Sequence, residues 1–117
     1  MQLDRLTELI PSLKEKAPRC DKFVELLKRY KRGDWIYPAE IHRKLKIDIF
    51  TVYEMLEVLR KNHLLHQYLE MSCPYCMRFT GRCYKAISEI PLDYHCPHCK
   101  QEISMPFEYT VVTYKVL

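Results

Sequence analysis

Four cysteines in two pairs are the residues of this sequence best suited to a defined chemistry. Each pair is a Cys-Pro-x-Cys motif, and 19 residues separate the second cysteine of the first pair from the first cysteine of the second. Two C-x-x-C pairs at this separation are typical of a zinc site, in which each pair supplies one edge of a thiolate tetrahedron. The sequence therefore predicts one structural Zn²⁺ per chain, bound by Cys73, Cys76, Cys96 and Cys99.

Two other uses of these thiols are open from the residues alone. A redox-active C-x-x-C usually stands alone in a βαβ setting, which this sequence does not show. Six cysteines could also form a secreted disulfide scaffold, but clustered pairs and an acidic, amphipathic N-terminal stretch unlike a signal peptide favour reduced thiols. We therefore expect a cytoplasmic, reducing location and a metal site.

The other potential ligands are interpreted as bystanders. Cys83, His95 and His98 lie near the second pair in sequence and could replace a thiol, whereas Cys20 is more typical of a small buried apolar residue. Four thiolates leave no coordination position open for a substrate or water. Because no nucleophile–base pattern or phosphate loop accompanies the cysteines, we expect a protein that is not an enzyme.

Each pair also lacks a residue that zinc knuckles often contain. Glycine is common just after the second cysteine, because the backbone there favours a positive φ. Met77 and Lys100 occupy these positions. A non-glycine residue can adopt this conformation at a local energetic cost.

Composition indicates one compact domain or two very small ones. The chain has 117 residues, 48% of them hydrophobic, only two glycines and no apolar run long enough to suggest a membrane span. The net charge of +4 comes from residues 1–62, which contain 14 Lys or Arg and 10 Asp or Glu, whereas residues 63–117 are neutral. This balance is mildly basic and gives only a modest electrostatic signal for nucleic acid.

The N-terminal segment predicts an amphipathic helix. Its apolar stripe has helical spacing, and Pro11 should bend the helix or break it in two. The stripe could pack on the chain's own domain or serve as a helix for dimerisation or for a protein partner; it consists of Leu3, Leu6, Ile10 and Leu13.

Residues 18–72 have the pattern of a small helical module. Asp21 is a candidate cap for a helix that runs through Tyr30, with Gly33 expected just after its end. A short strand over 34–37 is followed by a helix from Pro38 and by a second helix over 49–62, capped by Asp48. The alternating stretch 65–71 then predicts a strand.

This order of elements resembles the winged helix-turn-helix superfamily. The resemblance is carried by residues 35–41 and 47–65, above all by the D-x-x-T-V-Y-x-x-L-x-x-L pattern that begins at Asp48. It implies that helix 49–62 is a recognition helix and that strand 65–71 begins a wing. A wing needs a second strand, for which residues 107–117 are the best candidate. With its zinc ribbon, this chain loosely resembles the winged-helix/zinc-ribbon proteins of the transcription factor E alpha type, which assist RNA polymerase.

The expected architecture is therefore α+β, a winged helix-turn-helix with a four-cysteine zinc ribbon inserted in or extending its wing. The corresponding segments are an N-terminal helix over 1–17, the winged-helix core over 18–72, the ribbon over 73–99 and the returning strand over 100–117. The ribbon is too short to bury a core, so zinc should supply its folding free energy.

Two functions remain open. The first is a DNA-binding transcriptional regulator, with candidate contacts on the two central helices and their turn: Arg43, Lys44, Lys46, Thr51, Tyr53, Arg60 and Lys61. Glu54 and Glu57 on the same helix are unfavourable near phosphates. The second is a protein-interaction adaptor or accessory subunit that docks through the ribbon or the N-terminal helix. No membrane partner is expected.

Overall fold

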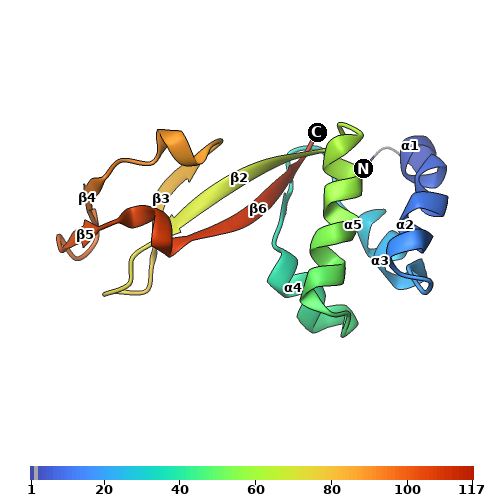
Figure 1. Cartoon of the computed structure of the whole chain (residues 1–117), viewed down its shortest axis with the longest axis horizontal. Helices are drawn as coiled ribbons and strands as arrows, with labels where there is room; N and C mark the ends of the chain where they lie inside the picture. Colours follow the sequence, from blue (N-terminus) through green and yellow to red (C-terminus); the bar gives the residue numbers. More distant parts are fainter. Residues whose placement is uncertain (2) are drawn as a thin grey trace. The chain divides into compact units, whose positions relative to one another are not determined.

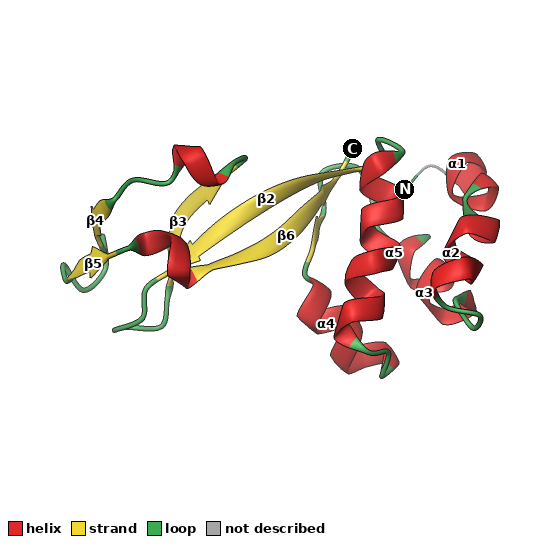
Figure 2. Ribbon diagram, in the orientation of Figure 1, coloured by secondary structure: helices red, strands yellow, loops and turns green. Residues whose placement is uncertain are grey.

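A computed structural model describes Met1 and residues 3–117 and shows an α+β chain with two compact units. Unit 1 comprises Met1–His66 and Tyr114–Leu117, and unit 2 comprises Gln67–Thr113. Helices are confined to unit 1 apart from two short 3₁₀ turns, as Figure 2 shows. None of the helices in the described part of the chain is both long and apolar enough to span a membrane.

The N-terminal segment forms two short helices, α1 (Leu3–Glu8) and α2 (Ile10–Lys16). The predicted break occurs at Leu9, which precedes α2, and Pro11 lies in the first turn of α2, where its missing N–H is tolerated. Leu6 and Leu13 are buried within the unit, and α2 packs on helix α5 (Ile49–Lys61). These two leucines belong to the chain's own core and are not available to a partner, whereas Leu3 is exposed.

Helix α3 (Asp21–Leu27) differs from the expectation at both ends. Asp21 is its first residue and not its cap; Cys20 occupies the cap position without a side-chain hydrogen bond. The helix ends at Leu27, well before Gly33, so Gly33 is not the residue that terminates it. Gly33 has φ 92° and donates its N–H to the carbonyl of Val116 (2.8 Å), which ties the loop to the last strand.

Helices α4 (Pro38–Leu45) and α5 form the centre of unit 1, with α5 lying between α4 and α2 in Figure 1. Pro38 begins α4 as predicted. Lys46 ends it in a left-handed conformation at φ 56°. Asp48 caps α5 as predicted, since its Oδ2 accepts hydrogen bonds from the N–H groups of Phe50 (3.1 Å) and Thr51 (3.3 Å).

Four strands form one sheet in the order β1, β6, β2, β3. They are β1 (Trp35–Ile36), β6 (Thr110–Val116), β2 (Leu65–Ser72) and β3 (Phe79–Tyr84). β1 pairs antiparallel with β6, with Trp35 opposite Lys115, and β2 pairs antiparallel with β3. The predicted neighbour of the 65–71 strand is thus β6, although residues 106–109 form the 3₁₀ turn η2 (Pro106–Tyr109) instead of extending this strand.

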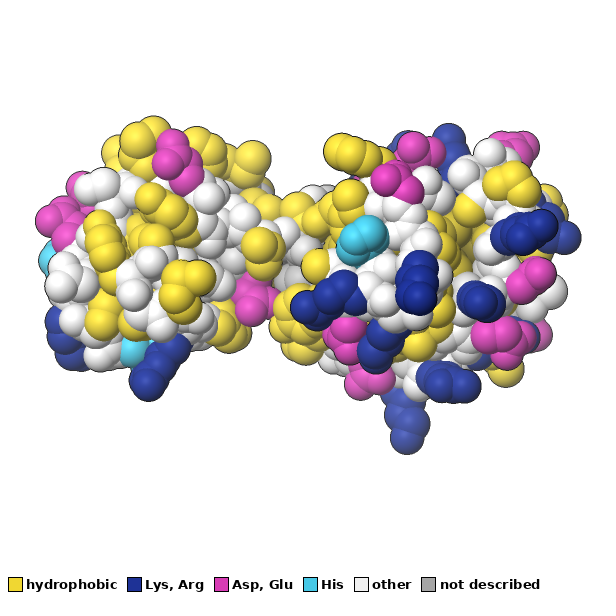
Figure 3. Space-filling view, turned by 90° about the horizontal axis from the view of Figure 1, so that it is seen from below, with side chains coloured by type: hydrophobic (Ala, Val, Ile, Leu, Met, Phe, Trp, Pro, Cys, Tyr) yellow, Lys and Arg dark blue, Asp and Glu magenta, His cyan; other side chains and the backbone are white. Residues whose placement is uncertain are grey.

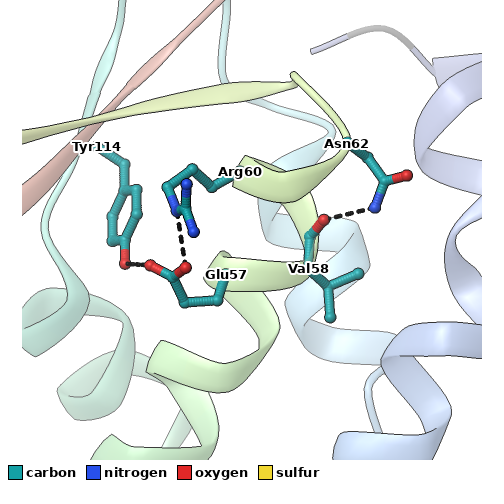
Figure 4. A network of polar contacts seen from close by, with 5 residues as sticks. All are labelled: Glu57, Val58, Arg60, Asn62 and Tyr114. Atoms are coloured by element: carbon teal, nitrogen blue, oxygen red, sulfur yellow. Dashed lines mark hydrogen bonds and ion pairs between the residues drawn. The ribbon is translucent and has the colours of Figure 1, made fainter.

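The core of unit 1 is a conventional apolar interior. It includes Phe23, Ile41, Leu56 and Leu59, all fully buried. Tyr114 of β6 is buried beside α5, and its hydroxyl donates to Glu57 Oε1 (2.8 Å). In Figure 4 the same carboxylate also accepts from Nε of Arg60 (2.7 Å). Burial, and then the hydrogen bond to Glu57, raises the pKa of Tyr114.

Unit 2 has a much smaller interior. Besides β3 and parts of β2 and β6, it contains η1 (Ile87–Glu89) and a two-stranded antiparallel sheet of β4 (Asp93–His95) and β5 (Glu102–Ser104). Its central cluster consists of Cys73, Cys96 and Ile103, with Tyr94 and the other two paired cysteines packed against them. The side chains at the centre of this unit are therefore mainly thiols.

Candidate metal centre and nucleic-acid face

The two cysteine pairs form backbone turns of the same kind. In each turn the N–H of the first cysteine donates to the carbonyl five residues later, Arg78 (2.9 Å) or Gln101 (3.0 Å). The N–H four residues after that cysteine donates back to its carbonyl, at 3.0 and 2.9 Å. The N–H two residues after it points at its sulfur, at 3.4 Å from Tyr75 to Cys73 and 3.4 Å from His98 to Cys96. Each turn thus presents two sulfurs on one side.

The turns bring four thiols to one point. Sγ of Cys73 lies 3.6 Å from Sγ of Cys99, Sγ of Cys76 lies 3.7 Å from Sγ of Cys96, and all four sulfurs are within 4.8 Å of one another. Thiolates bound at about 2.3 Å to a tetrahedral ion are about 3.8 Å apart, so the cluster has the dimensions of a four-sulfur metal site. The first cysteine of each pair is buried and the second is partly buried. The sulfurs are too far apart for disulfides.

The thiols differ in acidity before any metal binds. The backbone N–H of Cys99, helped by that of His98, lowers the pKa of the Cys96 thiol to about 6 against the effect of burial. The N–H of Arg78 lowers the pKa of Cys76, but burial and the three neighbouring thiols outweigh it and raise the pKa to about 11. A cation is needed to keep all four sulfurs ionised together, and binding it displaces protons.

The positions after the second cysteines have the positive φ that glycine would favour. Met77 has φ 61° and Lys100 has φ 65°. Both backbones carry the N–H that donates back into the turn, so the left-handed conformation is part of the turn itself. Met77 is also 80% exposed. These two residues therefore adopt a strained backbone conformation at equivalent positions beside the candidate metal site.

The neighbouring ligands predicted to be bystanders lie outside the cluster. Among the described residues that could hold a metal in this unit, only the four paired cysteines come together. His98 contacts the carbonyl of Phe79 through Nε2 (3.1 Å), His95 is exposed on β4, and Cys83 is exposed on β3 opposite Glu70. Cys20 is fully buried in the core of unit 1, as expected.

The donor set limits which ions fit this centre. Four thiolates in a tetrahedral arrangement suit zinc or iron and disfavour magnesium or calcium, which require oxygen ligands. Comparisons with protein-family models, curated proteins and solved structures found no match. Chemistry and geometry together show four cysteines that could bind a metal ion such as zinc.

The residues predicted to contact DNA come from α4, α5 and the turn between them. Thr51 and Tyr53 are two positions apart on α5 and therefore point to opposite flanks of the helix. Arg60 is paired with Glu57, and Lys44 is paired with Glu40 (2.8 Å). The exposed cations among these residues are Arg43, Lys44, Lys46 and Lys61, of which only Lys44 forms an ion pair among the described residues.

The outer side of α5 carries an apolar groove. Phe50, 74% exposed, lines it with Tyr53 and Val58, and two lysines and two glutamates complete its lining, namely Lys16, Lys61, Glu54 and Glu57. The groove has a volume of about 400 Å³. Glu57, the second acid that the sequence placed here, lines the groove and is also held by Tyr114 and Arg60. This side of the helix is thus partly apolar, and its two acids are balanced by two lysines.

A second hollow, which the sequence did not reveal, lies at the turn between α4 and α5. It has a volume of about 600 Å³, and three cations line it together with one acid and two apolar side chains: Arg19, Lys22, Lys46, Asp21, Leu45 and Ile47. Arg19 and Lys46 are far apart in the sequence. No local pattern could therefore have joined them; only the packing of α3 on α4 does so.

Charge is divided unequally between the units. Unit 1 contains 15 Lys or Arg and 10 Asp or Glu, a net +5, whereas unit 2 contains 4 and 5, a net −1. On the face drawn in Figure 3, Lys and Arg side chains are concentrated on unit 1 and hydrophobic side chains are prominent on unit 2. A zinc ion with four thiolates would add two further negative charges to unit 2.

Proposed function

We propose that the chain is a zinc-stabilised winged-helix protein that binds double-stranded DNA through the α4–α5 side of unit 1. The observation that carries this proposal is the sheet order β1, β6, β2 beside the α3, α4, α5 helices, which is the order expected of a winged helix with its wing formed by β2 and β6. The net charge of +5 on the same unit supports attraction to phosphates.

The zinc ion has a structural role in this proposal. Four thiolates would close its coordination shell, and the ion would hold unit 2 as a ribbon that extends the wing. Zinc-binding thiolates need a reducing compartment, which fits a cytoplasmic regulator of transcription. A closed four-thiolate shell leaves no position for a substrate, so the role we propose is not enzymatic.

A protein-interaction adaptor is the second candidate, and a specific observation favours it. Nine of the 13 exposed large hydrophobic side chains found among the described residues belong to unit 2, and Phe50 is exposed in the groove on α5. Contiguous exposed apolar surface is typical of protein docking sites. In this role the chain would be an accessory subunit of a larger complex.

A salt-dependent DNA titration separates the two functions. The zinc-loaded full chain is mixed with a labelled 30-base-pair duplex, and the dissociation constant is measured from low to physiological ionic strength. A DNA-binding protein should bind at low salt, with a log–log slope of about −0.9 for each phosphate neutralised. If no salt-sensitive binding occurs even at the lowest ionic strength, the DNA function is wrong and the adaptor takes its place.

A further inference from the structure

The hollow at the α4–α5 turn has an excess of positive charge that the protein itself does not neutralise. Arg19, Lys22 and Lys46 line it with Asp21 as the single acid, which leaves a formal net charge of +2. Three like charges around one hollow repel one another. An anion bound among them would relieve this repulsion.

Three cations of unit 1 are neutralised by a nearby carboxylate. Lys28, Lys44 and Arg60 each form an ion pair with a carboxylate three or four residues earlier in the chain. In the described part of the chain no ion pair forms with any of the three cations of the hollow. Other exposed cations such as Lys14, Lys31 and Arg32 form no ion pair there either, so the three are distinguished by lining one hollow together.

The N-terminus of α5 does not account for the site. The first N–H groups of α5 already donate to Asp48, so they are not free to bind an anion. The anion would instead be held by side chains that arrive from two segments, the start of α3 and the α4–α5 turn. The left-handed conformation of Lys46 turns the chain at this point, and Lys46 lines the hollow.

We propose that Arg19, Lys22 and Lys46 form a phosphate-binding site that anchors the sugar–phosphate backbone of a nucleic acid beside the start of α5. This inference rests on the proposed DNA-binding function and deepens it, because it names the contact that supplies affinity. The hollow is larger than a single phosphate needs and is also lined by Leu45 and Ile47, which suits a stretch of backbone with its sugars. Contacts of this kind position a protein on DNA without reading its sequence.

The test compares two triple variants with equal loss of charge. Arg19→Gln/Lys22→Gln/Lys46→Gln removes the cations of the hollow, and Arg32→Gln/Lys14→Gln/Lys31→Gln removes one arginine and two lysines that lie outside it and are exposed on unit 1. Both are zinc-loaded and checked for an unchanged melting temperature. Duplex binding is then measured against salt concentration.

The hollow variant should bind the duplex at least tenfold more weakly at low salt and lose about two to three units of log–log slope, at about 0.9 per phosphate. The control variant should lose less than threefold. If both variants weaken binding equally, only net charge matters and the site is overturned. If the hollow variant binds like the unaltered chain, the site is overturned while the proposed DNA function stands.

A second measurement separates the site from the DNA function. Inorganic pyrophosphate is titrated into the labelled unaltered chain, and backbone amide shifts are followed by NMR. Saturable shifts at Lys22 and Lys46 that disappear in the hollow variant support a phosphate site, even if no duplex binds and the DNA function fails. Shifts spread evenly over exposed lysines, without saturation, overturn it.

Discussion

The two units differ in what fills their interiors. Of the 21 buried apolar side chains among the described residues, 17 belong to unit 1, and only four belong to unit 2, two of them cysteines. Unit 1 can therefore be held by burial of apolar surface in the usual way. Unit 2, with 47 residues, lies in the size range where a metal or disulfides usually have to supply the missing stability.

The surfaces of the two units also differ, and here unit 2 carries more of the large apolar side chains. Unit 1 buries most of its apolar residues, Phe50 being an exception, and it exposes cations. Unit 2 exposes Met77, Ile87, Leu92 and other large apolar side chains, and its own net charge is slightly negative. A metal-held unit does not need its large side chains for a core, so they are free to lie on the surface. The two units should therefore respond to different perturbations and meet different partners.

Metal removal should give the largest effect and should act on unit 2 alone. A structural zinc site contributes on the order of 10 kcal/mol to folding. Chelation, or the substitution Cys96→Ser, should therefore abolish hydrogen-exchange protection in unit 2 while the helices of unit 1 keep theirs. Elemental analysis should give one zinc per chain before treatment. Full zinc content after replacing both Cys73 and Cys96 would contradict the assignment.

Acid should produce the same loss gradually. Metal-bound thiolates have depressed pKa values, so their contribution to stability is present at neutral pH and is lost as the pH falls and protons compete for the sulfurs. The thiols of Cys76 and Cys99, whose pKa values are raised in the free cluster, must give up protons when the metal binds. Zinc affinity measured with a competing chelator should fall steeply below neutral pH, and binding should release protons into weak buffer.

A core truncation should act on unit 1 and leave the metal in place. Leu56 of α5 is fully buried, so Leu56→Ala should lower the free energy of unfolding by about 2–5 kcal/mol. Zinc content should not change. Leu92→Ala, at an exposed position of unit 2, is the control and should change stability by less than about 0.5 kcal/mol. Zinc loss in Leu56→Ala would show that the units do not fold separately.

Removal of one hydroxyl should give a smaller loss in the same unit. Tyr114→Phe leaves Glu57 Oε1 without its donor and should cost about 1–2 kcal/mol in chemical denaturation. Because burial raises the pKa of Tyr114, the unaltered chain should lose stability as the pH rises above about 10, where the unfolded phenol ionises, and the variant should lose less. Tyr109→Phe, at an exposed tyrosine, is the matched control.

Sequence patterns predicted the local chemistry better than the long-range packing. The spacing of the cysteines, the cap at Asp48 and the break near Pro11 depend on neighbours in the chain, and each is found in the structure. The end of α3 and the cation hollow depend on which elements meet in space, so the sequence did not reveal either feature. The pairing of Arg60 with Glu57 follows helical spacing and could have been predicted, but the hydroxyl of Tyr114 could not.

The smallest expected effect has the opposite sign and tests the strain beside the metal. Met77 and Lys100 adopt positive φ at equivalent points of the two turns, which costs a non-glycine residue about 1 kcal/mol each. Met77→Gly and Lys100→Gly should therefore each raise the resistance of unit 2 to a chelator or to heat by up to about that amount, reduced by the greater freedom of glycine in the unfolded chain. Tyr75→Gly, within the first turn but outside the positive-φ positions, should lower it. If all three glycine variants weaken zinc retention equally, the backbone strain at Met77 and Lys100 contributes nothing, and the difference between the two units must be explained by the metal alone.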